Sequence, residues 1–339
     1  MKIAMLAPPW IPIPPTRYGG IEAVVAPLTN RLVDLGHDVT LFCPPGSTSK
    51  AEVRAVLPRV HPEDIGAVLH EVDHVTRVLD VLDWEHFDVL HDHTMTAVTF
   101  AKRIETPVVH TMHNGHAGDL GDFYERLSRD GAHLVAISED QRTSAPVGIR
   151  IAAAIPNPID LDEWPYQPHL KQDYALWIGR LDEAKGPDRA IRAMRKTDIP
   201  LIIAGPVQKG AEPYFREKVE PYLNGQIRYI GEVGGRRKKV LFANASALLM
   251  PIRWEEPFGM VMVEALACGT PVVAFPHGAA REIVIDGKNG RLVDDEIEMA
   301  DVLTDLDMDP AYCRESVGSR YGVDIVADGY VEVYRHAMK

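Results

Sequence analysis

Cysteine is scarce in this sequence, and long apolar runs are missing. The three cysteines, Cys43, Cys268 and Cys313, lie far apart without a Cys-x-x-Cys pair, which argues against a disulfide framework and fits a reducing compartment. No run approaches the ~18 consecutive apolar residues that a membrane-spanning helix needs. The apolar run before Pro8 is too short for a signal peptide. We therefore expect a cytoplasmic protein whose membrane contact, if any, is weak and peripheral.

Positive charge is also in short supply, with 36 Lys and Arg residues against 49 Asp and Glu residues and a net charge of −13. Such a chain repels polyphosphates at long range, so we expect no nucleic-acid partner that binds through counterion release. Apolar residues make up 46% and charged residues 25%, which excludes wholesale disorder and a fibrous repeat. At roughly 150 residues per domain, the 339 residues predict about two domains.

The first half of the chain alternates short apolar runs with helical patterns. The segment KIAML, a proline-rich loop, a helical pattern at 21–36 and the run HDVTLFC form a βαβ unit. Further strands are predicted at 88–91, 107–110 and 133–137, and helices near 66–82 and 96–102. Strands this short and apolar are typical of a parallel sheet covered on both faces. Pro27 lies inside the first helical pattern and predicts a kink or a late helix start.

A segment with four prolines and little periodicity, residues 155–173, precedes a second alternation. That alternation predicts strands in YALWIGR, PLIIAGP, IRYIGE, ASALLMPI and TPVVAF, and helices at 187–196, 213–223, 236–244 and 259–268. The fold class is therefore α/β, with two Rossmann-like, doubly wound parallel-sheet domains that face each other across a cleft. We place the first domain at 1–158, the linker at 159–173 and the second domain at 174–323, and expect a helix at 324–339 to complete the first domain. Such sheets bind ligands at the carboxyl ends of their strands.

The segment EPFGMVMVE, residues 256–264, predicts an anion site. A helix that begins near Gly259 presents free backbone N–H groups at Gly259, Met260 and Val261. Glu264, about a turn and a half further on, can accept two hydrogen bonds from a vicinal diol such as a ribose. Glu256 lies just before the helix, and a carboxylate beside an anion is energetically unfavourable unless hydroxyl groups donate hydrogen bonds to it. A sugar supplies such hydroxyl groups. The alternative is a carboxylate that only serves the helix dipole, together with a solvated Glu264.

The segment GRLDEAKG, residues 179–186, directly follows the first strand of the second domain. Its Arg180 and Lys185 combine a planar guanidinium with a compact ammonium, the usual combination for a diphosphate. The alternative is a surface ion-pair loop, in which these two cations pair with Asp182, Glu183 and Asp188.

Five segments together resemble the retaining glycosyltransferases of family 4, which have the GT-B fold. They are GGIE at 19–22, VHTMH at 109–113, IPNPID at 155–160, GRLDEAKG and EPFGMVMVEALACGTPVVA, and they occur in the family's order over nearly the whole chain. The resemblance implies a nucleoside-diphosphate sugar as donor, held mainly by the second domain, and an acceptor held mainly by the first. It implies no bound metal and no cofactor beyond the donor.

The resemblance also implies a role for each matched residue. The residues that act at the reacting groups are Glu256 on sugar hydroxyls, His113 near the reacting carbon, and Arg180 and Lys185 on the diphosphate. The residues that bind the rest of the donor are Gly19, Gly20, Gly205, Ile230, Glu232, Gly259, Met260, Val261 and Glu264. Within this second group, Gly19 and Gly20 offer backbone amides to the diphosphate, Glu264 binds the ribose, and the segment 227–233 contacts the base.

The chemistry that the resemblance implies is a metal-independent, retaining transfer of a hexose, with UDP-glucose as the first donor to consider. Cations and amides stabilise the departing diphosphate, while the acceptor hydroxyl attacks from the leaving-group face. The acceptor stays open among a small molecule, a lipid-linked sugar and a natural product, and we expect a monomer or a homodimer. A sugar-nucleotide epimerase or a phosphorylase of the same fold is the alternative enzyme.

Two further features allow other interpretations. His91 and His93, two residues apart on a strand, share one face, and with His113 they could form the zinc site of a hydrolase. The basic run at 236–239 opens a predicted helix and could touch anionic lipid headgroups, although four adjacent charges are more often a solvated face.

Overall fold

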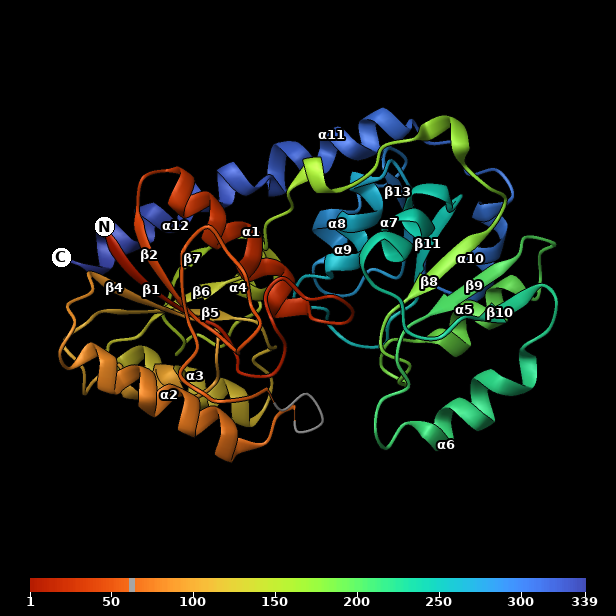
Figure 1. Cartoon of the computed structure of the whole chain (residues 1–339). Coiled ribbons are helices and arrows are strands. Elements are labelled where there is room, and N and C mark those ends of the chain that lie inside the picture. The colour runs from red at the N-terminus through yellow and green to blue at the C-terminus, as the bar shows by residue number, and fades with distance from the viewer. Residues whose placement is uncertain (61–64) are drawn as a thin grey trace. The chain divides into compact units, whose positions relative to one another are not determined.

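The computed structural model describes residues 1–60 and 65–339, and these form two compact units (Figure 1). The first unit contains Met1–Pro158 and Val323–Lys339, and the second contains Ile159–Gly322. The segment predicted as a linker, 159–173, therefore belongs to the second unit. Arg314 of the second unit binds this segment, because its guanidinium donates hydrogen bonds to the carbonyl oxygens of Leu161 (2.8 Å) and Trp164 (3.1 Å).

In the described part of the first unit, seven parallel strands form a sheet of order β3-β2-β1-β4-β5-β6-β7. The strands are β1 (Lys2–Leu6), β2 (Asp38–Phe42), β3 (Glu52–Arg54), β4 (Val89–Asp92), β5 (Val108–Met112), β6 (His133–Ala136) and β7 (Ile151–Ala154). The apolar runs predicted as strands are confirmed to within two residues, because a strand buried on both faces has to be apolar throughout. The sequence analysis missed β3 and β7.

Helices cover both faces of this sheet (Figure 1). They are α1 (Gly20–Asp34), α2 (Val68–Leu82), α3 (Asp119–Arg129), α4 (Glu139–Thr143), the 3₁₀ turn Ala97–Phe100 and α12 (Val323–Ala337). The expected late start of the first helix is wrong, because α1 begins at Gly20 and runs through Pro27. Its buried face, including Val25, Leu28 and Leu32, joins the core beside the sheet, and this packing outweighs the hydrogen bond lost at the proline.

The predicted helix at 96–102 is only a 3₁₀ turn, Ala97–Phe100. Side chains from the end of β4 bind its backbone amides: Asp92 accepts from Val98 N (3.0 Å) and Thr94 accepts from Ala97 N (3.1 Å). Such local hydrogen bonds compete with a regular helix.

The C-terminal helix α12 belongs to the first unit, and Figure 1 shows it in blue beside α1. It buries Val326, Tyr330, Val331 and Tyr334 in the core that α1 and the sheet also line. The chain thus returns to its first domain after completing the second.

In the described part of the second unit, six parallel strands form a sheet of order β10-β9-β8-β11-β12-β13. The strands are β8 (Ala175–Ile178), β9 (Leu201–Ala204), β10 (Ile227–Tyr229), β11 (Ala247–Met250), β12 (Val272–Ala274) and β13 (Gly290–Leu292). The helices are α5 (Pro187–Met194), α6 (Glu212–Tyr214), α7 (Gly235–Asn244), α8 (Met260–Ala267), α9 (Ala280–Ile283), α10 (Glu296–Leu303) and α11 (Pro310–Tyr321).

The helix predicted at 213–223 is irregular in the structure. After α6 the chain continues as a π turn (Phe215–Val219) and a 3₁₀ turn (Glu220–Tyr222). Pro221 has no backbone N–H to donate, which breaks the regular ladder there. Within the described residues, no helix combines the length and the apolar character that a crossing of the bilayer requires.

Candidate active site

The carboxyl ends of β8, β9 and β10 meet at one edge of the second sheet, and glycines allow them to lie close together. Gly179 N donates to the Ala204 carbonyl (3.0 Å), and Gly205 N donates to the Gly231 carbonyl (2.9 Å). A Cβ at Gly205, whose φ is +138°, would overlap the Gly179 carbonyl oxygen, so this position needs glycine. Arg180, Gly205 and Ile230 therefore follow neighbouring strands at the same edge.

Arg180 and Lys185 have different partners. The Nε of Arg180 lies 3.7 Å from Asp182 Oδ2, and about a third of its side chain is exposed. Asp182 is one of the acids that the ion-pair-loop interpretation names, and at this distance the guanidinium stays partly exposed. Lys185 instead forms an ion pair with Glu256, from the loop after β11, and its ammonium lies 4.7 Å above the Trp254 ring.

The contact between Lys185 and Glu256 unites the two segments that the sequence analysis singled out in the second domain. Glu256 is only 7% exposed, so a carboxylate here needs a cation or several hydrogen-bond donors. Lys185 supplies the charge here. A diphosphate and a sugar could replace this contact, the first by binding the ammonium and the second by donating hydroxyls to the carboxylate.

The amino end of α8 lies directly beside Glu256. Gly259 caps the helix with φ +90°, and a Cβ at this glycine would come within 3.3 Å of Glu256 Cγ and would overlap the Met262 side chain. The first amides of α8, at Met260 and Val261, have no acceptor within the helix. A cation, a carboxylate and backbone amides that have no acceptor within their helix thus gather at the carboxyl end of β11.

Glu264 is buried, and the interpretation of a solvated Glu264 is wrong. Its side chain lies in α8 and is 3% exposed, and its Oε1 accepts a hydrogen bond from Lys238 Nζ of α7 at 2.6 Å. Its Oε2 is buried and has no partner among the described residues. An unpartnered carboxylate oxygen is an open acceptor for a hydroxyl donor.

The basic run at 236–239 is largely engaged within the protein. Lys238 pairs with Glu264, and Lys239 pairs with Glu163 at 2.7 Å. Only Arg236 and Arg237 of this run are exposed. The sequence analysis missed the role of Lys238, because nothing local in the sequence indicates which acid it meets.

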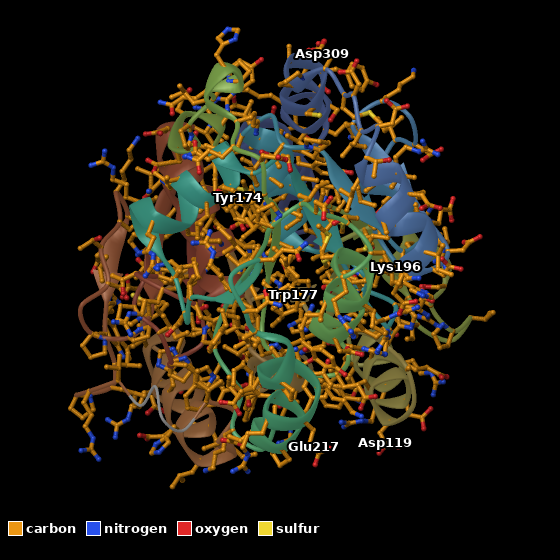
Figure 2. The ribbon with its side chains drawn as sticks, turned by 90° about the vertical axis from the view of Figure 1, so that its right-hand side faces the viewer. Asp119, Tyr174, Trp177, Lys196, Glu217 and Asp309 are labelled. Atoms are coloured by element: carbon orange, nitrogen blue, oxygen red, sulfur yellow. The ribbon has the colours of Figure 1, made fainter. Side chains whose placement is uncertain are left out.

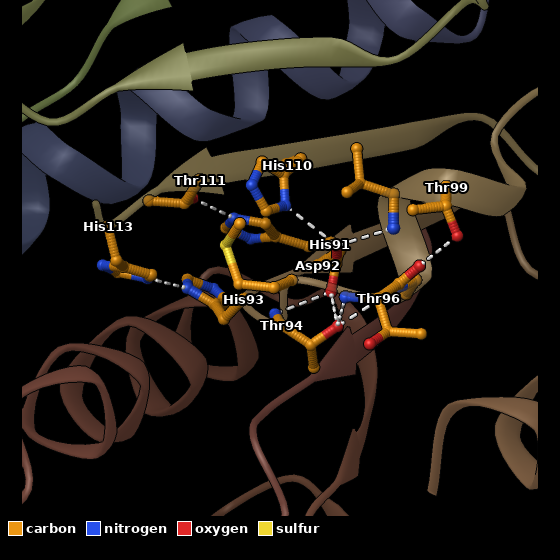
Figure 3. A network of polar contacts seen from close by, with 12 residues as sticks. His91, Asp92, His93, Thr94, Thr96, Thr99, His110, Thr111 and His113 are labelled. Carbon is orange, nitrogen blue, oxygen red and sulfur yellow. Dashed lines mark hydrogen bonds and ion pairs between the residues drawn. The ribbon is translucent and has the colours of Figure 1, made fainter. Parts of the chain in front are cut away.

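In the first unit, β4 and β5 end in a buried network of histidines and hydroxyls (Figure 3). His91 has no exposed surface, and both of its ring nitrogens are used: Nε2 contacts Thr111 Oγ1 (2.8 Å) and Nδ1 contacts Tyr334 Oη of α12 (2.6 Å). The described residues contain no group of three or more side chains arranged to hold a metal ion. They therefore give no support to the zinc-hydrolase interpretation.

His113 lies at the outer end of this network and is only partly buried. Its Nε2 contacts Nδ1 of His93 at 2.8 Å, and the two rings stack with centroids 5.1 Å apart (Figure 3). Burial, with a smaller contribution from the nearby His110, lowers the pKa of His113 to about 3. At neutral pH His113 is therefore an uncharged hydrogen-bonding group, which suits a sugar hydroxyl better than it suits a phosphate.

Gly19 and Gly20 stand at the start of α1. Gly19 is the N-cap, and a Cβ at Gly20 would meet no atom within 4 Å, so packing does not require glycine at position 20. The sequence analysis missed the next polar residue, Glu22, which is 4% exposed. Burial raises its pKa to about 7.

Comparison with known proteins gives two family models that match this chain. The model described as "Glycosyltransferase Family 4" matches residues 18–163, and that described as "Glycosyl transferases group 1" matches residues 159–314. A phosphatidyl-myo-inositol mannosyltransferase of Mycolicibacterium smegmatis is 28% identical over 89% of this chain and 84% of its own length. A D-inositol 3-phosphate glycosyltransferase of Frankia alni is 26% identical over 94% of this chain and 95% of its own.

Solved structures share the fold over the whole chain. AviGT4, a glycosyltransferase of avilamycin A biosynthesis, is 26% identical with a TM-score of 0.75 over 99% of this chain and 98% of its own. HepE of Anabaena, solved with UDP and glucose, is 20% identical with a TM-score of 0.78 over 99% of this chain and all of its own. The two family models together span residues 18–314, and the chain belongs to the family 4 glycosyltransferases, with the two Rossmann-like, parallel-sheet domains of the GT-B fold.

Proposed function

We propose that this glycosyltransferase transfers a hexose from a nucleoside-diphosphate sugar, with UDP-glucose as the first candidate, to an acceptor hydroxyl with retention of configuration and without a metal ion. The observation that carries the proposal is the ion pair of Lys185 with Glu256 beside the amino end of α8. The HepE structure with UDP and glucose supports the choice of donor only through the shared fold. The names of the sequence relatives support transfer from a sugar donor.

The cations of the second domain stabilise the leaving group in this proposal. Cleavage of the bond between the anomeric carbon and the phosphate oxygen leaves negative charge on the diphosphate. Arg180, Lys185 and the first amides of α8 bind that charge, in the place of a metal ion. When Lys185 turns to the phosphate, Glu256 loses its cation and accepts hydrogen bonds from the sugar hydroxyls instead.

The remaining donor contacts follow from what each residue can offer. Glu264 uses its unpartnered Oε2 to accept a hydrogen bond from the ribose. The backbone beside Gly205 and the segment with Ile230 and Glu232 bind the nucleotide in this proposal, as the family resemblance implies. In the first domain, Gly19 and Gly20 bind the diphosphate, and neutral His113 binds the sugar.

Retention is proposed to occur by attack from the leaving-group face. The acceptor oxygen bonds to the anomeric carbon as the carbon–phosphate oxygen bond breaks, and the acceptor's proton moves to the departing phosphate oxygen. The charge balance is then complete without a protein nucleophile. The acceptor stays open among a small molecule, a lipid-linked sugar and a natural product.

A donor panel tests the proposal directly. Purified protein is incubated with UDP, GDP and ADP sugars in the presence of a chelator, with water as acceptor, and release of nucleoside diphosphate is measured. We expect hydrolysis of one donor class, and turnover of Lys185→Ala and Glu256→Ala lower by at least ~100-fold, the scale of losing a transition-state stabiliser. Lys196→Ala, an exposed lysine of the same domain, is the matched control and should keep full turnover.

Three results would contradict the proposal. Near-normal turnover in both variants would remove the assigned roles of Lys185 and Glu256. A dependence on free phosphate would indicate a phosphorylase. Conversion of the donor to an isomeric sugar nucleotide, without release of the diphosphate, would indicate an epimerase.

A further inference from the structure

Two loops carry Lys185 and Glu256, and their backbones are joined directly. We call residues 179–186 and 251–258 the donor loops. Arg253 makes two of the joining bonds, because its backbone amide donates to the Ala184 carbonyl (2.8 Å) and its Nη1 donates to the Glu183 carbonyl (2.7 Å). Gly186, with φ +69°, approaches the Pro251 carbonyl so closely that a Cβ would overlap it.

The loop with Lys185 is also supported from inside the domain. Trp177 of β8 lies within the second unit (Figure 2), and its indole N–H donates to the Lys185 carbonyl at 3.3 Å. Trp177 of β8 thus binds the Lys185 carbonyl, and Arg253 binds the carbonyls of the two residues before it. The course of the backbone that carries Lys185 therefore depends in part on where Arg253 is held.

Asp188, in the first turn of α5, holds Arg253. Its two carboxylate oxygens accept from Nη1 and Nη2 of Arg253 at 2.8 and 2.6 Å, which is a bidentate ion pair. The carboxylate also accepts from Tyr214 Oη (2.5 Å) and from Arg192 Nη1 (2.7 Å). Asp188 is 6% exposed. Burial alone would raise its pKa, but hydrogen bonds from Arg253 and Tyr214 lower the pKa to about 2, so the carboxylate is ionised at neutral pH.

A planar guanidinium that is bound through both of its terminal nitrogens has a fixed orientation, whereas an ammonium bound by a single contact does not. The side chain of Lys185 is long and flexible, so its preorganisation has to come from the backbone that carries it. Displacement of a reacting or binding group by about 1 Å can cost about 100-fold in rate. A rigid connection between the donor loops therefore has a direct effect on the chemistry at Lys185 and Glu256.

We propose that Asp188 and Arg253 are positioning residues of the donor site: their bidentate pair holds the two donor loops together and so sets Lys185 against Glu256. The inference rests on the proposed function, since it concerns the same site. Neither residue is required to touch the donor. Loss of the pair should let the loop with Lys185 move while the sheet beneath it stays folded.

Glu296 of α10 offers a matched control. Its carboxylate pairs with Arg189 (2.8 Å) and Arg192 (2.7 Å), and both of these cations belong to α5. Burial would raise the pKa of Glu296, but hydrogen bonds from Arg192 and Arg189 lower it to about 2, as at Asp188. Glu296→Gln therefore removes two ion pairs to the same helix without touching the bond to Arg253.

The test compares Asp188→Asn, Arg253→Lys and Glu296→Gln in the full chain. Four quantities are measured: the melting temperature, the affinity for UDP by calorimetry, the turnover of donor hydrolysis, and hydrogen exchange of backbone amides at 179–186. Asp188→Asn and Arg253→Lys should lower turnover by about 10-fold or more and speed exchange in this loop. Glu296→Gln should lower the melting temperature by a similar amount but leave turnover within about 2-fold and exchange unchanged.

A double variant adds a second criterion. Because Asp188 and Arg253 act as one unit, the variant with both substitutions should be no slower than the slower single variant. Arg253→Lys keeps a positive charge at the site, so it remains informative if Asp188→Asn does not fold.

The outcomes separate this inference from the proposed function. Equal turnover and equal loop exchange in Asp188→Asn, Arg253→Lys and Glu296→Gln would overturn the positioning role, since only stability would then be affected. Wild-type protein that neither binds UDP nor hydrolyses any donor would overturn the proposed function. The exchange comparison would still decide whether the pair holds the donor loops.

Discussion

Replacing Lys238 by methionine should destabilise the second domain far more than replacing its partner Glu264 by glutamine. The asymmetry comes from exposure, since a quarter of the Lys238 side chain is exposed but only 3% of that of Glu264. In Lys238→Met the Glu264 carboxylate stays buried with no cation, and its other oxygen is already without a partner among the described residues. In Glu264→Gln the ammonium can turn to water, and it lies 5.7 Å from the Trp164 ring and 5.9 Å from the Phe242 ring, which also favour a cation.

The magnitudes follow from these surroundings. A buried carboxylate that loses its partner costs about 3 kcal/mol or more, whereas the loss of one partly exposed charged hydrogen bond costs about 1 kcal/mol. The difference of about 2 kcal/mol corresponds to about 4–8 °C in melting temperature for a domain of this size.

Urea unfolding, followed by circular dichroism and tryptophan fluorescence, measures this difference, with Trp164 close to the pair as a local reporter. The variant with both substitutions removes both charges and should be about 2 kcal/mol more stable than Lys238→Met alone. A larger loss in Glu264→Gln than in Lys238→Met would refute the reasoning, and so would a double variant less stable than Lys238→Met.

Three further predictions concern buried groups elsewhere. Burial raises the pKa of Glu22 from 4.5 to about 7, so its carboxyl favours folding at low pH and opposes it as the pH rises through 7. In urea unfolding, Glu22→Gln should therefore increase the free energy of unfolding by about 3 kcal/mol at pH 8 and by almost nothing at pH 4. A gain that is the same at both pH values would contradict the burial argument. The Nε2 of His74 contacts the Ala7 carbonyl at 3.1 Å, and burial lowers the pKa of His74 to about 4. The contribution of neutral His74 to the free energy of unfolding is therefore complete above pH 6.5 and is lost as the pH falls toward 4, so the loss of stability between pH 7.5 and pH 5 should be about 2 kcal/mol smaller in His74→Gln than in the wild type. Calorimetry that shows the same loss in both proteins would exclude His74 as its source. Gly205→Ala should cost about 3 kcal/mol or more because its Cβ overlaps the Gly179 carbonyl; Gly20→Ala, which meets open space, is the control, and equal melting temperatures for the two variants would show that the close approach at Gly205 is unimportant.

The strands were the most predictable part of the fold. The runs that became β1 and β8 are apolar over their whole length because both faces of a parallel sheet are covered. Short strands such as β3 and β7 were missed, since three or four residues with partly exposed side chains leave no clear pattern. The helix α11 was missed for a different reason, because its apolar residues show almost no helical periodicity.

The donor-site residues were predicted from their motifs, but their partners were not. The motifs place Lys185 and Glu256 on loops after two different strands, and their roles in binding a donor stay predictions. The ion pair between them depends on β8 and β11 being neighbours in the sheet. That neighbourhood is a property of strand order, which local sequence does not encode.

Apolar periodicity and motif chemistry were thus enough to predict two parallel-sheet domains and the strand ends that carry charge. Both signals lie in consecutive residues, because a buried strand is apolar along its length and a binding loop holds its charged residues within one short segment. The pairing of Lys238 with Glu264, and of Tyr334 with His91 across 243 positions of the chain, depended on how helices return to a sheet. Contacts between such distant residues form only when whole helices and strands pack together, because only then are the two side chains buried next to each other and in need of a polar partner.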